Sequence, residues 1–189
     1  QRLGADAIGQ VFYAKSPRYL SDLALARQIA EAAGPFVTCV GLFVDPTAQW
    51  VQQVVSEVPV HLLQFHGDEA NEFCSSFTRP FIKALRMKPG LDVHACMQQF
   101  PAAQGFLLDT YKHGVPGGTG ESFDWGLAPR SSPKSWVLAG GLTPDTVAQA
   151  LAQTDPYGVD VSGGVESAPG IKCPEKIKRF IEQVREATS

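Results

Sequence analysis

The sequence predicts an α/β fold, a (βα)8 TIM barrel, and three observations support this fold class. Short apolar runs rich in β-branched residues alternate with segments of helical periodicity along the whole chain, as in a parallel sheet covered by helices. No inserted domain, linker or low-complexity segment interrupts the alternation, so residues 1–189 are expected to form a single domain. The last two apolar runs each lead into a glycine-rich turn, at the position where barrels of this class bind phosphate.

The expected strands are the apolar and β-branched runs of strand length. In chain order they cover 6–13, 36–44, 61–66, 80–85, 104–109, 135–139 and 158–162. Two of the helices between and after them are clearest, because 46–58 and 174–187 each carry one apolar stripe. Prolines that suit the first turn of a helix stand at three expected helix starts, Pro46, Pro144 and Pro174. Thr143 is placed to cap the helix that Pro144 opens.

The glycine turns distinguish a closed barrel from an open doubly wound sheet. The sequence has neither the G-x-G-x-x-G of a dinucleotide-binding sheet nor a G-x-x-x-x-G-K-[ST] phosphate loop. Instead, the last two strands run into Gly140-Gly141 and Ser162-Gly163-Gly164, whose backbone N–H groups can hold a phosphate. In a barrel this site follows strands 7 and 8. If the last two expected strands are strands 7 and 8, the seven expected strands are strands 2 to 8. We therefore expect an N-terminally incomplete barrel that lacks strand 1 and most of helix 1, with an open seam between strands 8 and 2.

Composition excludes several other classes of protein. The net charge is −3 with a pI near 5.8 and no basic block, which gives no electrostatic footprint for nucleic acid. The longest apolar stretches, such as 36–44, are far shorter than the ~20 residues that span a bilayer. The 4 cysteines and 4 histidines form no Cys-x-x-Cys, HExxH or other metal-ligand pattern, so we expect reduced thiols, a cytoplasmic protein and no metal.

Three strands carry polar residues at positions that face the centre of a barrel. If the apolar residues of each strand pack outward on helices, then Asp109, Asp160 and the pair Gln64 and His66 point inward. Active sites of barrels lie at the C-terminal ends of the strands, where these side chains would meet. The pattern alone therefore predicts an enzyme that acts on a small phosphorylated molecule, its phosphate held at Gly140, Gly141, Ser162 and Gly163.

Each candidate also has a purely structural interpretation. Asp109 could cap the loop that follows it, His66 could order the turn at 67–69, and Asp160 could make a buried hydrogen bond inside the barrel. Arg18 lies in the loop after the first strand, where a solvated arginine is the usual case, yet this loop would overhang the mouth of the barrel. The glycine-rich segment 114–120 is either a flexible connection or a lid over the substrate.

Together, the motifs of the chain resemble those of the phosphoribosylanthranilate isomerase family of tryptophan biosynthesis. The resemblance runs through nearly the whole chain and rests on these motifs: GADAIGQVFYAKSPRY, VGLFVD, LLQFHGDE, FIKALR, LLDT, GVPGGTGESFDW, LAGGLT and VDVSGGVESAPGIK. It implies a (βα)8 barrel and an Amadori rearrangement without a cofactor. In that reaction N-(5-phosphoribosyl)anthranilate becomes 1-(o-carboxyphenylamino)-1-deoxyribulose 5-phosphate.

The resemblance also implies roles for residues of this sequence. A general acid opens the furanose ring, and the family's acid corresponds to Asp109 in the LLDT motif. Arg18 corresponds to the arginine that binds the anthranilate carboxylate, a role that suits a bidentate guanidinium. Asp160 would face the ribose and His66 would line the pocket. The phosphate would be held by the backbone at Gly140, Gly141, Ser162 and Gly163.

The sequence departs from the family at the general base. The family's base is a cysteine in a K-I-C-G-I-T-like segment on strand 1, which does not occur here, and none of the four cysteines stands in its place. We therefore expect the 189-residue chain alone to be inactive. Two alternatives are another phosphate-binding barrel enzyme, such as an indole-glycerol-phosphate synthase with Lys83 inside the barrel, and a phosphate-binding barrel without catalysis. The sequence leaves a monomer and a homodimer open.

Overall fold

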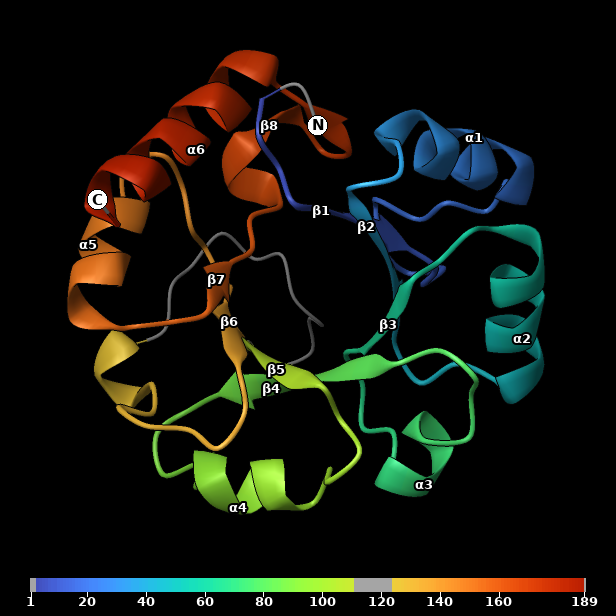
Figure 1. Ribbon diagram of the computed structural model, residues 1–189, viewed down its shortest axis with the longest axis horizontal. Coiled ribbons are helices and arrows are strands. Elements are labelled where there is room, and N and C mark those ends of the chain that lie inside the picture. The colour runs from blue at the N-terminus through green and yellow to red at the C-terminus, as the bar shows by residue number, and fades with distance from the viewer. Residues whose placement is uncertain (1–2, 111–123, 189) are drawn as a thin grey trace. The chain divides into compact units, whose positions relative to one another are not determined.

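The computed structural model describes residues 3–110 and 124–188 (Figure 1). The candidate lid at 114–120 lies outside these described residues. The chain divides into two compact units, Gln1–Lys83 with Pro101–Gln104, and Ala84–Phe100 with Gly105–Ser189. The expectation of a single domain stays a prediction.

The first unit is a parallel α/β layer in which strands and helices alternate. Its elements are β1 (Ala7–Val11), α1 (Leu23–Ala33), β2 (Thr38–Phe43), α2 (Ala48–Glu57), β3 (Leu62–Phe65), α3 (Asn71–Cys74) and the start of β4 (Phe81–Met87). The strands pair in parallel and in chain order, β1 with β2, β2 with β3, and β3 with β4. Parallel pairing of consecutive strands needs a crossover between them, and the helices provide it.

Aromatic side chains form much of the core of this unit. The Phe65 ring on β3 lies 6.2 Å from the Phe43 ring on β2 and 5.8 Å from the Phe73 ring on α3. Phe77 and Phe81 also contact it, with ring centroids 5.8 and 5.9 Å away. Phe65 therefore packs between the sheet and its covering helix, on the outward face that the sequence pattern predicts for it.

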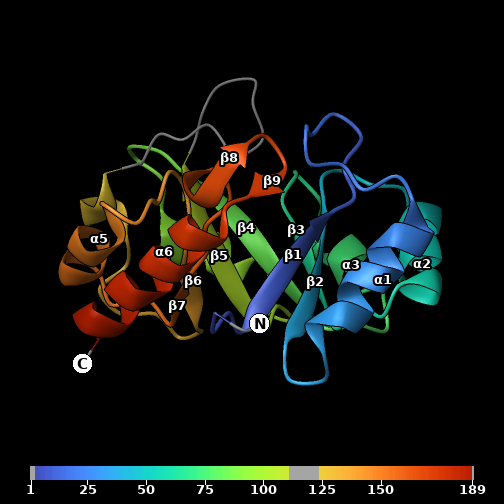
Figure 2. The same cartoon turned by 90° about the horizontal axis from the view of Figure 1, so that it is seen from above.

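The second unit begins with the end of β4 and adds a second series of parallel strands. Its further elements are α4 (Val93–Gln98), β5 (Gly105–Thr110), η1 (Trp125–Leu127), β6 (Trp136–Leu138), α5 (Val147–Gln153), β7 (Gly158–Val159), η2 (Gly163–Val165), β8 (Glu166–Ala168), β9 (Ile171–Lys172) and α6 (Pro174–Ala187). β5, β6 and β7 pair in parallel, whereas β8 and β9 form a small antiparallel hairpin beside α6 (Figure 2). Helix α6 packs against α5 and η2.

The expected strands are all present, although their ends differ from the prediction by one to three residues. β4 continues to Met87 instead of ending at residue 85. β7 ends at Val159, so the prediction of a strand over 158–162 is wrong in its second half. The chain leaves the extended conformation at Ser162, where φ is −119° and ψ is −82°, in order to enter η2. The hairpin of β8 and β9 was not expected from the sequence.

The proline signals predicted one helix start correctly and two too early. Helix α6 begins at Pro174 as expected. Helix α2 begins at Ala48, because the Thr47 hydroxyl caps it by accepting from the Trp50 N–H, and Pro46 precedes this cap. Helix α5 begins at Val147, because Pro144 lies in a turn instead.

Candidate active site

Asp109 lies at the C-terminal end of β5 in the second unit. Asp109 is only 5% exposed, and its Oδ1 atom accepts a 2.8 Å hydrogen bond from the Thr110 N–H. The neighbouring strand residues Phe106 and Leu108 are fully buried in the core. Every residue of β5 is buried, so the strand places this carboxylate in the interior, and its expected direction toward the centre of a barrel stays a prediction.

The turn after β6 brings backbone directly against Asp109. Gly140 and Gly141 both have positive φ angles, +83° and +67°, which side-chain-bearing residues rarely adopt. A Cβ atom added to Gly140 would lie 2.9 Å from the Asp109 Oδ1 atom and 2.6 Å from the Thr110 N atom. The position therefore requires glycine both for its conformation and for the close approach.

The turn after β7 packs on the turn after β6. A Cβ atom added to Gly164 would collide with the Leu142 carbonyl and approach within 3.0 Å of Thr143 Cα. The two glycine turns that the sequence singled out are therefore in direct contact. The Gly140 turn is also in contact with Asp109, so the second unit brings this carboxylate and both turns together.

Lys172 is a residue of this site that sequence reasoning missed. Its ammonium group donates to the Ser162 carbonyl oxygen at 3.0 Å and pairs with the buried Glu166 carboxylate at 2.9 Å. The hairpin of β8 and β9 thereby ties back onto the second glycine turn. The only available signal was a lysine shortly after the turn, and a short polar hairpin carries no apolar periodicity that would reveal the contact.

Asp160 is exposed in the structure, so the alternative interpretation, in which it makes a buried hydrogen bond inside the barrel, is wrong. It follows the last residue of β7, and its backbone N–H donates to the Leu138 carbonyl at 2.8 Å. The shortness of β7 explains the difference, because the side chain stands beyond the strand and not within it.

Arg18 belongs to the first unit and lies in the turn that returns to the end of β1. Tyr19 forms a bridge with Val11, the last residue of β1, and the Leu20 N–H donates to the Val11 carbonyl. The backbone N–H of Arg18 donates to the Ser16 hydroxyl at 3.1 Å, and the residue is half-buried. The turn thus holds Arg18 beside the C-terminal end of its strand.

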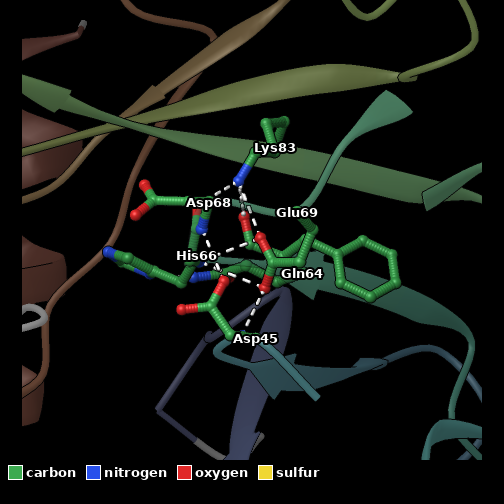
Figure 3. Close-up of polar contacts among 8 residues, drawn as sticks. Asp45, Gln64, His66, Asp68, Glu69 and Lys83 are labelled. Carbon is green, nitrogen blue, oxygen red and sulfur yellow. Dashed lines mark hydrogen bonds and ion pairs between the residues drawn. The ribbon is translucent and has the colours of Figure 1, made fainter. Parts of the chain in front are cut away.

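His66 directly follows β3 in the same unit and is 7% exposed. Its backbone N–H donates to the Phe43 carbonyl on β2 at 2.8 Å. Its ring Nδ1 lies 3.1 Å from Gln64 Nε2, so the two side chains occupy the same face of the strand, as the pattern predicts (Figure 3).

A buried ion pair lies next to His66. Lys83 from β4 and Glu69 from the loop after β3 are 2.8 Å apart and point toward one another (Figure 3). Sequence reasoning considered Lys83 only as the lysine of a rival enzyme and did not single out Glu69. Their pairing depends on the conformation of the loop 67–69, which strand periodicity does not encode.

Two further properties concern metals and membranes. Among the residues that the structure describes, no three His, Cys, Asp or Glu side chains come together in a group that could hold a metal ion. Over the same residues, no helix combines the length and the apolar character that crossing a membrane requires.

The parallel α/β architecture, with ionisable side chains at the carboxyl ends of its strands, defines the class of the protein. Solved structures similar to this chain are TIM-barrel enzymes. A structure of phosphoribosyl anthranilate isomerase from Thermotoga maritima is 36% identical, with a TM-score of 0.88 over 98% of this chain and 90% of that chain. A second structure of such an isomerase holds reduced 1-(o-carboxyphenylamino)-1-deoxyribulose 5-phosphate; it is 35% identical, with a TM-score of 0.85 and the same coverage.

The particular family follows from the sequence comparisons. Residues 2–183 match the family of N-(5'-phosphoribosyl)anthranilate isomerase. A relative from Cellvibrio japonicus with that name is 58% identical over 186 residues, which are 98% of this chain and 86% of the relative. The chain belongs to the N-(5'-phosphoribosyl)anthranilate isomerase family, with the isomerase function of tryptophan biosynthesis, which confirms the resemblance and sets aside the two rival functions. The expectation that the 189 residues alone are inactive stays a prediction.

Proposed function

We propose that Asp109 is the general acid of the rearrangement and protonates the ring oxygen of the phosphoribosyl group. The observation that carries this proposal is the burial of the carboxylate at the end of β5, with the Gly140 backbone against it. A general acid must reach the atom that it protonates within hydrogen-bond distance, so a fixed carboxylate at a strand end suits the role. The LLDT motif that contains it supports the same assignment.

The substrate phosphate binds to backbone groups of Gly140, Gly141, Ser162 and Gly163. Support comes from the direct contact between the two turns and from the positive φ angles of the first turn, which only glycine adopts without strain. Successive N–H groups in such turns form concave anion sites. Lys172 adds a cation beside Ser162.

Three further assignments rest on the family motifs. Arg18 binds the anthranilate carboxylate, since a guanidinium can donate two parallel hydrogen bonds to it. His66 lines the substrate site, and Asp160 faces the ribose; its exposure leaves it accessible to a ligand. The similarity to the Thermotoga maritima structure supports a (βα)8 barrel as the complete fold. We also assign the enzyme to the cytoplasm, because its four cysteines show no pairing pattern.

The role of Asp109 is tested by Asp109→Asn, with Asp155→Asn, an exposed aspartate of the same unit, as the control. Both changes are made in the 189-residue chain and in a chimera that carries a strand–helix unit with the family's cysteine motif before Gln1. In whichever of these two proteins is active, we expect Asp109→Asn to lower kcat by about 10²- to 10⁴-fold, the usual contribution of general acid catalysis. Its affinity for the reduced product analogue, measured by calorimetry, should change little. An Asp109→Asn protein with the kcat of the control would refute the assignment.

A further inference from the structure

The buried pair Lys83–Glu69 needs an explanation other than stability. The two side chains are 5% and 2% exposed, and their Nζ and Oε2 atoms are 2.8 Å apart. Removing two charges from water costs about as much as their attraction returns, so a buried ion pair is weak evidence for a stabilising role.

Lys83 holds the residues on both sides of His66. Besides Glu69, its ammonium group donates to the Gly67 carbonyl oxygen at 2.5 Å and lies 3.4 Å from the Phe65 carbonyl oxygen. An ammonium group has three N–H donors, and the oxygens of Phe65, Gly67 and Glu69 all lie within their reach. This geometry suits a fixed cross-link and not a nucleophilic lysine, which needs a deprotonated amine facing the substrate.

Glu69 holds the same segment from its other side. Its carboxylate accepts from the Gly67 N–H at 3.0 and 3.2 Å and from the Asp45 N–H, at the end of β2, at 2.9 Å (Figure 3). The Asp45 carboxylate in turn accepts from the Asp68 N–H at 2.7 Å. The loops after β2 and β3 are therefore joined through two carboxylates.

Backbone strain is concentrated at this junction. Asp45 has a φ angle of +44°, the only positive value outside glycine among the described residues. A Cβ atom added to Gly67 would lie 2.6 Å from Asp45 Cγ and 2.7 Å from Asp45 N, so the loops meet too closely for any side chain there. Strained backbone that neighbouring contacts hold in place is typical of functional sites.

His66 is the side chain that this junction presents. Gln64 Nε2 donates to its Nδ1 atom at 3.1 Å, with the Gln64 amide oriented as the structure assigns it. A neutral imidazole that accepts at Nδ1 carries its proton on Nε2. The arrangement thus selects one tautomer, with an N–H donor on the far side of the ring.

We propose that Lys83 and Glu69 are a positioning pair, which fixes the backbone on both sides of His66 and keeps its imidazole as an Nε2–H donor to the substrate. This inference rests on the substrate-binding role proposed for His66. Neither Lys83 nor Glu69 touches the substrate itself. The pair acts through the position and the tautomer of a third residue.

The first test reads His66 directly, without any ligand. Long-range ¹H–¹⁵N spectra report which ring nitrogen carries the proton, in the native chain, in Lys83→Met/Glu69→Gln and in the exposed control pair Lys178→Met/Glu182→Gln. The double variant removes both buried charges together and so leaves neither unpaired; Glu69→Gln alone replaces it if the double variant does not fold. We expect a single Nε2–H tautomer in the native and control proteins and a mixture in the variant. Unchanged His66 signals in the variant would overturn the proposal.

The second test is a mutant cycle with the reduced product analogue. We expect loss of the pair to weaken binding about tenfold in the native background and to have no further effect in a His66→Ala background, because coupled residues are not additive. Equal losses in both backgrounds would mean a merely structural role and contradict the proposal. A native chain that fails to bind the analogue would count against the proposed function, and the His66 spectra would still decide the positioning role.

Discussion

The four cysteine thiols differ in burial, and burial controls how readily a thiol ionises. Cys39 and Cys74 are fully buried, whereas Cys96 and Cys173 are half-buried. Burial raises the pKa of Cys39, and it raises the pKa of Cys74 to about 12. The thiolate is the form that reacts, so a raised pKa means less reactive thiol at any pH below it.

We therefore expect two classes of thiol in a titration with an aromatic disulfide reagent at pH 8. Cys96 and Cys173 should react first, and Cys39 and Cys74 should react only on unfolding or far more slowly. The slow class should speed up as the pH rises, since more thiolate forms on approaching the raised pKa. A Cys96→Ser/Cys173→Ser variant is the control and should lack the fast phase. Four thiols with one common rate would contradict the prediction.

Single site residues were predictable where strand alternation determines their direction. A period of two predicted inward side chains for Asp109 and His66, and the structure buries both at the carboxyl ends of β5 and β3. Glu69 and Lys172 were missed, because their partners depend on how a loop or a hairpin folds back. Asp160 was expected within a strand, but it lies just beyond β7 and is exposed. The end of β7 depends on the turn that follows it, which strand periodicity does not encode.

At the scale of an element, α1 shows how one polar residue stabilises a helix. Asp22 precedes the helix, and its Oδ1 atom accepts from the N–H groups of Ala24 and Leu25 at 2.9 and 3.1 Å. The buried face of α1 consists of alanines only, Ala26, Ala30 and Ala33, which bury little apolar surface. The cap therefore carries a larger share of the helix's stability than it would on a helix packed through large side chains.

We expect Asp22→Ala to lower the free energy of unfolding by about 1 kcal/mol, the usual cost of losing an N-cap side chain. Ser21→Ala, one residue earlier and also exposed, should change it by less than about 0.5 kcal/mol. Urea unfolding followed by circular dichroism measures both. Equal midpoints for the two variants would show that the capping bonds contribute nothing.

Element boundaries were harder to predict than element types. The strands were recovered because apolar residues recur along each, yet two helix starts were set too early by their prolines. In α5 the Val147 N–H donates to the Thr143 carbonyl, and the Thr143 hydroxyl accepts from the Asp145 N–H. The residues from Thr143 to Thr146 thus form a hydrogen-bonded turn ahead of the helix, a distinction that depends on hydroxyl geometry and not on composition.

At the scale of the whole molecule, the fold class was predictable while the stability of its parts was not. Alternating strands and helices appear in the sequence as alternating periodicities, and they imply parallel pairing wherever strands are consecutive. The sequence pattern does not indicate which aromatic side chains form the core. Phe36 is the first residue of the expected strand 36–44 and looks like a core residue, yet it is 93% exposed, whereas Phe65 is fully buried.

These two phenylalanines provide a matched test of how the first unit is stabilised. Phe65→Ala removes a ring that contacts Phe43, Phe73, Phe77 and Phe81, and it should lower the free energy of unfolding by about 3–5 kcal/mol. Phe36→Ala makes the same chemical change on the surface and should cost less than about 0.5 kcal/mol. Since proteins are stable by only about 5–15 kcal/mol, the first change should remove a large part of the total.

Urea unfolding followed by tryptophan fluorescence in a Trp125→Phe/Trp136→Phe background reports on this unit, because the remaining Trp50 packs edge-on against Phe12 in the same core. We expect Phe65→Ala to shift the midpoint to clearly lower urea, with Phe36→Ala superimposed on the native curve. If the two variants unfold at the same urea concentration, the aromatic cluster does not carry the stability of the first unit. The core would then depend on the aliphatic contacts of β2 and β3 instead.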